Sequence, residues 1–283
     1  MGLTEYLVDD MKDVLLAGDN VLIEGHPGSG KTSNCRGPLT EALASELGIH
    51  PSEIAFHDVR GATMEPVDIR GLPEIDREAG LTRWFPPDFL PTTGPAIICL
   101  EELPNWNKAL HYALYQLTEE REVNGVKLDD NVFIIATGNL RSSGSGVTKL
   151  PSALRDRFVE FAWVPDPDDW RSWAAGYGIH YKWIAATNYL SDLITDYDGV
   201  AATEGKVSNE RNVTKAALCY AKRNLDKLTN SSSAADKAKL MRMMSGYLGE
   251  VDAGRVIGFL RIFDKLVPIP SIIADPDNAE KPE

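Results

Sequence analysis

Over the first 165 residues, short runs of apolar and β-branched side chains alternate with patterns of helical period. The runs predict five strands, at residues 20–24, 53–59, 96–100, 132–136 and 159–164. Between them, apolar positions recur on one helical face, as at Leu110, Leu114 and Leu117. Strands separated by helices favour an α/β domain of three αβα layers, with a parallel five-stranded sheet in the middle layer.

After residue 165 the apolar residues recur with helical period throughout, which predicts an all-α domain. Four segments show this period, and they begin at Trp170, Val213, Leu240 and Val256. Pro165-Asp166-Pro167 separates the two patterns, because each proline disfavours helix in the residue before it. We therefore expect domains at residues 1–165 and 166–274, followed by a disordered tail at residues 275–283.

Two local signals add detail to the first domain. Asn124-Gly125 follows Glu122-Val123 and precedes Val126-Lys127, which predicts a tight β-hairpin. Gly37-Pro38 interrupts a helical segment, and a proline there removes one helical hydrogen bond. A kink or short break is therefore expected after Arg36.

Composition narrows the class of protein. The 283 residues are 43% hydrophobic and 25% charged, as in an ordinary globular protein. Three cysteines without a C-x-x-C pair argue against a disulfide framework or a zinc site. No apolar stretch approaches the roughly 18 residues that span a bilayer, and the N-terminus is acidic. We expect a cytoplasmic protein with no membrane contact, in a bacterial cell or a phage-infected host. The net charge of −13 argues against a broad nucleic-acid surface.

Residues 25–32 have the pattern G-x-x-x-x-G-K-[ST] of a phosphate-binding loop. Its glycines let backbone N–H groups turn inward around the β- and γ-phosphates, while Lys31 neutralises their charge and the Thr32 hydroxyl can bind Mg²⁺. The loop follows a predicted strand and opens a predicted helix, as this chemistry requires. The expected nucleotide-binding residues are Gly25, His26, Pro27, Gly28, Ser29, Gly30, Lys31, Thr32 and Ser33.

Two acidic residues, Glu101 and Glu102, end the apolar run at residues 96–100. The strand would place both carboxylates at its C-terminal edge, opposite the phosphates. Because adjacent strand residues point to opposite sides, the two acids cannot share a role. We assign Glu101, with Thr32, to the Mg²⁺ site and Glu102 to polarising the attacking water.

The sequence around these acids resembles the AAA+ ATPases, and more narrowly their MoxR-type, dynein-related branch. The resemblance rests on Leu100-Glu101-Glu102-Leu103, Ile135-Ala136-Thr137-Gly138-Asn139, Leu150-Pro151-Ser152-Ala153-Leu154-Arg155-Asp156-Arg157-Phe158 and Pro167-Asp168-Asp169-Trp170. It implies a P-loop NTPase domain with a helical lid that binds ATP and Mg²⁺ and hydrolyses ATP. It further implies a homo-oligomeric ring, expected to be hexameric, that remodels a client or adaptor protein. Family resemblance suggests a protein of the von Willebrand A type as one such partner.

The same resemblance gives roles to three further residues. Asn139 resembles the sensor-1 residue that orients the attacking water, although an Asn there can also cap the next loop. Arg157 resembles the arginine finger that reaches a neighbouring subunit's site, with Arg155 as the alternative. Arg211 resembles the sensor-2 arginine at the start of a helix capped by Ser208 or Asn209. The family usually has aspartate where Glu101 stands and proline where Glu210 stands. The first departure is compatible with slow hydrolysis.

Residues 61–94 form a connection too long to be inert in a compact domain. In MoxR-type ATPases the corresponding insertions face the pore or a partner, so Arg83, Trp84, Phe85 and Phe89 are candidates for gripping a substrate. Packing of Trp84 and Phe89 onto the domain is the equal alternative. Trp163, Trp170, Trp173 and Trp183 are interpreted as core of the helical domain rather than as a recognition surface.

The leading hypothesis is therefore an AAA+ remodelling ATPase. Three alternatives stay open: a phosphotransferase acting on a small acceptor, a nucleotide-gated scaffold that turns over slowly, and an AAA+ motor acting on DNA. A phosphotransferase would need a lid with several arginines around the transferred phosphate, whereas those of the helical domain are scattered.

Overall fold

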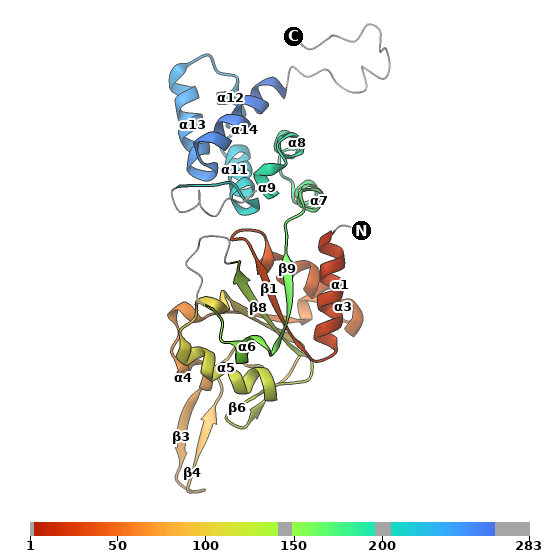
Figure 1. Ribbon diagram of the computed structural model, residues 1–283, viewed down its shortest axis with the longest axis vertical. Coiled ribbons are helices and arrows are strands. Elements are labelled where there is room, and N and C mark those ends of the chain that lie inside the picture. Colours follow the sequence, from red (N-terminus) through yellow and green to blue (C-terminus); the bar gives the residue numbers. More distant parts are fainter. Residues whose placement is uncertain (1–2, 141–148, 196–204, 264–283) are drawn as a thin grey trace. The chain divides into compact units, whose positions relative to one another are not determined.

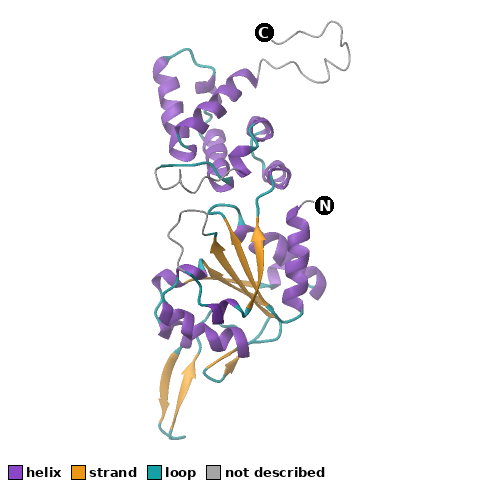
Figure 2. Ribbon diagram, viewed as in Figure 1, coloured by secondary structure: helices purple, strands orange, loops and turns teal. Residues whose placement is uncertain are grey.

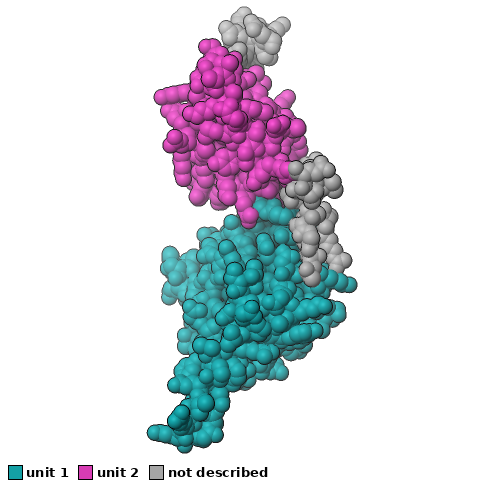
Figure 3. Space-filling model, turned by 90° about the vertical axis from the view of Figure 1, so that its left-hand side faces the viewer, with its two compact units in different colours: residues 1–164 teal, residues 165–283 magenta. Residues whose placement is uncertain are grey.

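The computed structural model describes residues 3–140, 149–195 and 205–263 (Figure 1). The chain divides into two compact units, residues 1–164 and 165–283 (Figure 3). The tail expected at residues 275–283 lies outside the described residues. In the part of the chain that is described, no helix has both the length and the apolar character needed to cross a membrane.

A parallel five-stranded sheet forms the centre of the first unit (Figure 2). In spatial order its strands are β2 (Ala55–Arg60), β5 (Ala96–Glu101), β8 (Val132–Asn139), β1 (Asn20–Gly25) and β9 (Phe158–Trp163). All five strands were expected from the sequence, with ends that differ by up to three residues. The order places β1 between β8 and β9, so that the residues after β1 meet the ends of both neighbours.

Helices cover both faces of this sheet and complete the three-layer αβα arrangement (Figure 1). One face carries α1 (Leu3–Leu16), α2 (Lys31–Asn34), the π-helical turn η1 (Cys35–Leu39) and α3 (Thr40–Leu47). The other face carries α4 (Pro66–Arg70), the turn η4 (Leu103–Asn105), α5 (Lys108–Glu120) and α6 (Ser152–Arg155). Two short turns, η2 (Pro51–Glu53) and η3 (Gly61–Thr63), flank β2.

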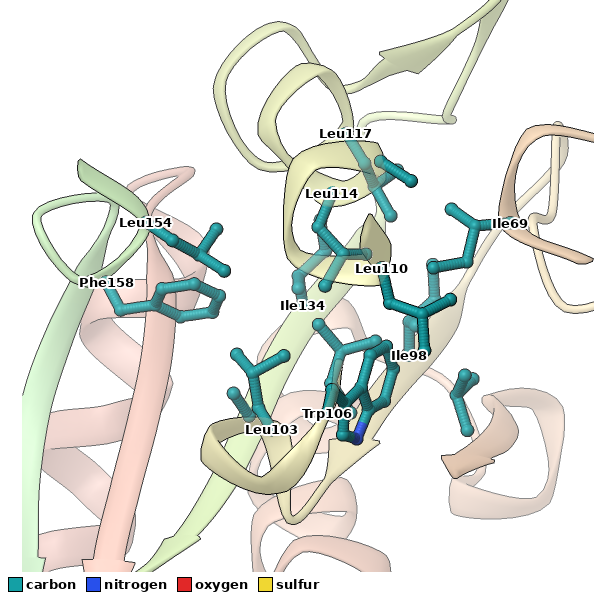
Figure 4. Packing of buried hydrophobic residues seen from close by; sticks show 14 of the residues in the cluster. Ile69, Ile98, Leu103, Trp106, Leu110, Leu114, Leu117, Ile134, Leu154 and Phe158 are labelled. Carbon is teal, nitrogen blue, oxygen red and sulfur yellow. The ribbon is translucent and has the colours of Figure 1, made fainter. Parts of the chain in front are cut away.

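The buried side chains of the strands alternate between the two faces. Ile97 and Ile135 pack against α1 and α3, whereas Ile98 and Ile134 pack against η4 and α5. Figure 4 shows the buried cluster between the sheet, η4 and α5, in which Leu110 and Trp106 lie close to the sheet residue Ile98. Each central strand is buried on both sides, which explains why these segments read as continuous apolar runs.

The predicted break near Pro38 takes the form of a π-helical turn. α2 ends at Asn34, η1 follows without a gap, and α3 continues the helix from Thr40. Pro38 lies inside this turn and has no N–H for a helical hydrogen bond, which accounts for the irregularity at this place. The Thr40 hydroxyl donates a hydrogen bond of 2.8 Å to the Cys35 carbonyl across the turn.

The first unit also contains two hairpins. β6 (Glu122–Val123) and β7 (Val126–Lys127) pair around Asn124-Gly125, both with positive φ, which confirms the predicted tight turn. β3 (Leu72–Asp76) and β4 (Leu81–Phe85) form a second hairpin within the segment predicted only as a long connection. This second hairpin projects from the unit (Figure 1) and its apolar side chains are exposed.

The second unit is helical in its described residues, as the periodicity predicts. Its helices are α7 (Pro167–Tyr177), α8 (Tyr181–Tyr189), α9 (Asp192–Thr195), α11 (Glu210–Lys222), α12 (Asp226–Thr229), α13 (Ala234–Leu248) and α14 (Glu250–Phe263). Trp170, Trp183 and Tyr220 are buried in its core. A bond of 2.8 Å joins the buried Lys182 ammonium to the Asp226 carboxylate, and this contact is the main reason that the pKa of Asp226 is lowered.

The interpretation of the four tryptophans is right for Trp170 and Trp183 and wrong for the other two. Trp173 is exposed on α7. Trp163 ends β9 and is buried in the first unit, against residues of α1 and the sheet. Its place follows from its register opposite Gly25 of β1 rather than from its closeness in sequence to the helical unit.

Candidate nucleotide site

The phosphate loop joins the end of β1 to the start of α2. Gly28 and Gly30 adopt left-handed backbone conformations with φ of 77° and 80°, which non-glycine residues adopt at a cost. Lys31 opens α2 and its ammonium donates to the carbonyl oxygens of Gly25 and His26, at 3.0 and 2.9 Å. The Ser29 hydroxyl donates to the same His26 carbonyl at 2.8 Å. The loop therefore curves around the lysine ammonium, the group expected to meet the phosphates.

Trp163 supports this loop from the neighbouring strand. Its indole N–H donates to the Ser29 carbonyl at 2.7 Å. A Cβ at Gly25 would lie 2.7 Å from the Trp163 carbonyl oxygen, so β9 can approach only because residue 25 is glycine. Gly25 thus has a packing role in addition to its place in the motif.

His26 is half-buried within the loop. Burial, and secondarily the positive charge of Lys31, lower the pKa of its imidazole below the ordinary value of 6.5. The ring is therefore neutral at physiological pH. Lys31 then provides the positive charge that the loop offers to phosphates.

The two predicted acids lie at the end of β5 and are both tied to Thr137 of β8. The Thr137 hydroxyl donates to the Glu101 carboxylate at 3.0 Å and accepts the Glu102 backbone N–H at 3.0 Å. Glu102 has a left-handed backbone with φ of 54°, which turns the chain sharply out of the strand. The chain therefore changes direction between the two acids, and their separate roles stay a prediction.

The turn η4, which follows these acids, is fixed by two further side chains. The indole N–H of Trp106 donates to the Glu101 carbonyl at 2.8 Å. His111 of α5 is buried, with its Nε2 atom 2.9 Å from the Leu103 carbonyl oxygen. Gly138 allows close packing, because a Cβ there would lie 3.1 Å from the Pro104 ring.

Asn139 ends β8 beside the phosphate loop. Its side-chain oxygen accepts a hydrogen bond of 3.3 Å from the Lys31 ammonium. The strand register pairs Asn139 with Gly25, and the Leu140 N–H donates to the Gly25 carbonyl. Lys31, Asn139, Thr137 and the acids thus meet at the carboxyl edge of three adjacent strands.

Both candidate finger arginines contact acidic residues of the first unit. Arg157 lies 2.9 Å from the Glu119 carboxylate, with its guanidinium 5.1 Å from the centre of the Tyr115 ring. Arg155 pairs with Glu160 and, at 3.1 Å, with Glu24, the residue directly before the phosphate loop. These pairs raise the pKa of Arg155. Arg155 is thereby connected to the site of its own chain, whereas Arg157 pairs with an exposed acid on α5.

Arg211 lies in the first turn of α11 in the second unit and is exposed. The helix is capped by Asn209, whose side chain accepts the Asn212 N–H. Ser208, the other predicted cap, instead donates to Asp252 at 2.6 Å. The sensor-2 role of Arg211 stays a prediction.

The donor set fits magnesium that arrives with a nucleotide. Within the residues that the structure describes, no group of three or more His, Cys, Asp or Glu could hold a metal ion alone. Mg²⁺ in nucleotide sites is commonly held by one or two protein oxygens together with phosphates and waters. The Thr32 hydroxyl and the Glu101 carboxylate, to which the sequence assigns the metal, are oxygen donors of this kind, and their assignment stays a prediction.

Sequence reasoning missed Thr137, Trp163 and His111 as residues that shape this site. Thr137 lies in the Ile135–Asn139 motif and Trp163 in a predicted strand, but neither belongs to the phosphate-loop or double-acid pattern. The available signal was position, because both end or nearly end parallel strands, and such ends gather at one edge.

The fold and the site together define a P-loop nucleotide-binding domain of the AAA+ class. Residues 20–158 match the family model of the AAA domain, dynein-related subfamily, and this part of the chain belongs to that family. AAA+ proteins generally bind ATP and Mg²⁺, hydrolyse ATP and commonly form rings. No curated protein matches the sequence significantly.

Several solved structures are similar to this chain at low sequence identity. A single-residue mutant of RuvB from Thermotoga maritima is 17% identical, with a TM-score of 0.48, over 99% of this chain and 83% of that chain. A candidate ATPase from Cytophaga hutchinsonii is 18% identical, with a TM-score of 0.43, over 84% and 63% of the two chains. NtrX from Brucella abortus is 17% identical, with a TM-score of 0.45, over 78% and 52%. The chain thus spans less than two thirds of the last two proteins.

Proposed function

We propose that this protein is an ATP-hydrolysing AAA+ machine that assembles into a ring and remodels a partner protein. The observation that supports the proposal is the convergence of Lys31, Asn139 and the acids Glu101 and Glu102 at one edge of the sheet. A nucleotide-binding loop alone would need only the first of these residues. Asn139 and Glu102 add the means to orient and polarise a water molecule.

In this proposal the residues have distinct tasks. Lys31 exchanges its bonds to the Gly25 and His26 carbonyl oxygens for bonds to phosphate oxygens when nucleotide binds. Bound Mg²⁺ would neutralise charge on the phosphates, held through Thr32 and Glu101. Glu102 accepts a proton from the attacking water, and Asn139 orients that water. Arg211 keeps the sensor-2 role that the family resemblance suggests.

The β3–β4 hairpin is the proposed client-contacting element. Ile75 and Leu72 are 73% and 66% exposed, and Trp84 and Phe85 are exposed beside them on β4. Arg83 is exposed and paired with Asp76 at 2.8 Å. Phe89 packs partly buried against the core, so the packing alternative holds for that residue. An exposed apolar hairpin suits binding to another protein, for which family resemblance suggests a von Willebrand A type partner.

Substitutions at Lys31 and Glu102 test the hydrolytic activity. Lys31→Ala is expected to abolish ATP binding, because the charge that offsets the phosphates is lost. Glu102→Gln is expected to retain ATP binding and stop hydrolysis, because only this residue acts on the water. Binding of a fluorescent ATP analogue and release of phosphate measure the two effects.

Two matched variants control for loss of charge alone. Lys127→Ala and Glu74→Gln change exposed residues of the two hairpins and should leave binding and hydrolysis at wild-type levels. Equal phosphate release by wild type and Glu102→Gln would refute the assignment of the base. Nucleotide binding without any hydrolysis in the wild type would instead favour the slow scaffold.

A further inference from the structure

Thr137 bonds to both acids of the site through one hydroxyl group. The hydroxyl has a single proton, which it gives to Glu101, and its lone pairs accept the N–H of Glu102. Thr137 is buried, with 1% of its surface exposed. The hydroxyl is therefore held in one orientation and cannot exchange either partner for bulk water.

Each of the two bonds fixes something that the chain would otherwise leave free. Glu101 has a long side chain with several rotamers, and the bond to one carboxylate oxygen selects among them. Glu102 has a left-handed backbone, which is unfavourable for a residue with a Cβ. The bond to its N–H helps to hold the backbone in that conformation and so fixes where its carboxylate begins.

The neighbours of Thr137 on β8 act on the same groups. Gly138 lets the Pro104 ring approach the strand, and Asn139 reaches the Lys31 ammonium. Residues 137–139 thus contact the metal acid, the turn that carries the base, and the phosphate-loop lysine in succession along one strand.

We infer that Thr137 is a positioning residue that sets the geometry of Glu101 and Glu102 together. The inference rests on the proposed function for its effect on turnover, but not for its effect on metal-dependent nucleotide binding. A threonine hydroxyl satisfies both bonds at once, whereas valine has nearly the same shape and satisfies neither. Loss of the hydroxyl removes the bond to one Glu101 carboxylate oxygen, so that a contact of 3.5 Å from the Cys99 thiol to the other oxygen remains, and it leaves the Glu102 N–H without its partner.

The test compares Thr137→Val, Thr137→Ala and Thr137→Ser in the full chain. Partners of this kind typically contribute about 10- to 100-fold to metal affinity or activity, and a reduction of that order is expected in the Val and Ala variants. They should need more Mg²⁺ for half-maximal binding of a fluorescent ATP analogue, and their kcat should fall. Thr137→Ser retains the hydroxyl and should restore both values towards wild type.

Thr118→Val is the matched control, because Thr118 is also a buried threonine of the first unit and its hydroxyl donates to the Leu114 carbonyl in α5. It should lower thermal stability without changing the Mg²⁺ requirement.

If Thr137→Val has the wild-type Mg²⁺ requirement, or if Thr118→Val shifts it equally, the inference is overturned. A wild type that binds the Mg²⁺ nucleotide but does not hydrolyse it refutes the proposed activity, while the Mg²⁺ requirement still decides the role of Thr137. A wild type that binds no nucleotide overturns both.

Discussion

His111 shows how a single buried residue links the stability of the site to pH. Its Nε2 atom lies against the Leu103 carbonyl, and its Nδ1 atom is buried without a hydrogen-bond partner in the described structure. Burial lowers the pKa of His111, and the bond to Leu103 opposes this only in part. A second proton on the ring is therefore less favourable in the folded chain than in water.

Acidification should accordingly destabilise the first unit through His111. The folded pKa is below the unfolded value of about 6.5, so the unfolded chain binds more protons as the pH falls through this value. The contribution to stability is present above about pH 6.5 and is lost below it. Unfolding midpoints at pH 7.5 and 5.5 should differ more for wild type than for His111→Phe, which cannot titrate. Parallel pH profiles would contradict this, and His26 supplies a residual slope of the same sign in both proteins.

Sequence reasoning found the residues of the site whose function depends on a contiguous motif. Lys31 and the two acids could be assigned because their neighbours in sequence complete a recognisable pattern. Thr137 and Trp163 act on residues 36 and 134 positions away, at Glu101 and Ser29. Those contacts depend on the order of the strands in the sheet and on their register, which a local pattern does not determine.

At the scale of elements, a strand could be predicted from the sequence when its faces are buried. The central strands are buried on both sides and stand out as apolar runs. The strands β3 and β4 have no buried face, and charged residues such as Glu74 and Arg83 interrupt them. No period-2 pattern marks them, so the hairpin could be anticipated only as a long connection.

Two tryptophans offer a matched test of which elements contribute to folding. Trp106 is 4% exposed, in the core cluster and against Gly61, whereas Trp84 is 38% exposed on the hairpin. Trp106→Ala is expected to reduce the free energy of unfolding by about 3–5 kcal/mol. Trp84→Ala should reduce it by clearly less, because more of this side chain stays in contact with water and it belongs to none of the buried core clusters. Urea unfolding of the full chain measures both values, and a large loss in Trp84→Ala would mean that the hairpin packs on the molecule.

At the scale of the whole molecule, the question is whether one chain contains a complete site. Arg155 is tied to Glu24 beside its own phosphate loop, whereas Arg157 is held by Glu119 on the surface of α5. If Arg157 gave up its ion pair with Glu119, its guanidinium could bind the phosphates in a neighbouring subunit. Arg155 could bind a neighbour's phosphates only by giving up its bond to Glu24, which lies beside the phosphate loop of its own chain.

Mixed oligomers distinguish these arrangements. Arg157→Ala alone should lower turnover by about 10³-fold with nucleotide affinity nearly unchanged, if it stabilises the transferred phosphoryl group. Mixing it with Glu102→Gln creates interfaces with an intact Glu102 and an intact Arg157, so some activity should return. The same mixture with Arg155→Ala should recover little, because the bond to Glu24 is lost within the active subunit. Mixtures as inactive as both parents, or a rate that does not rise with protein concentration, would favour a self-contained site.

The π-helical turn after the phosphate loop has a consequence for helical phase. Lys31, Cys35, Leu39 and Leu43 are all buried and lie four residues apart. In a regular α-helix each step of four residues overshoots a full turn by about 40°, so Leu43 would be rotated by about 120° from Lys31. The wider turn at residues 35–39 absorbs part of this angular drift. Removal of one residue there would give a more regular helix but turn Lys31 by about 100° relative to Leu43. The irregular turn thus allows one helix to direct its lysine to the phosphates and its leucines to the sheet.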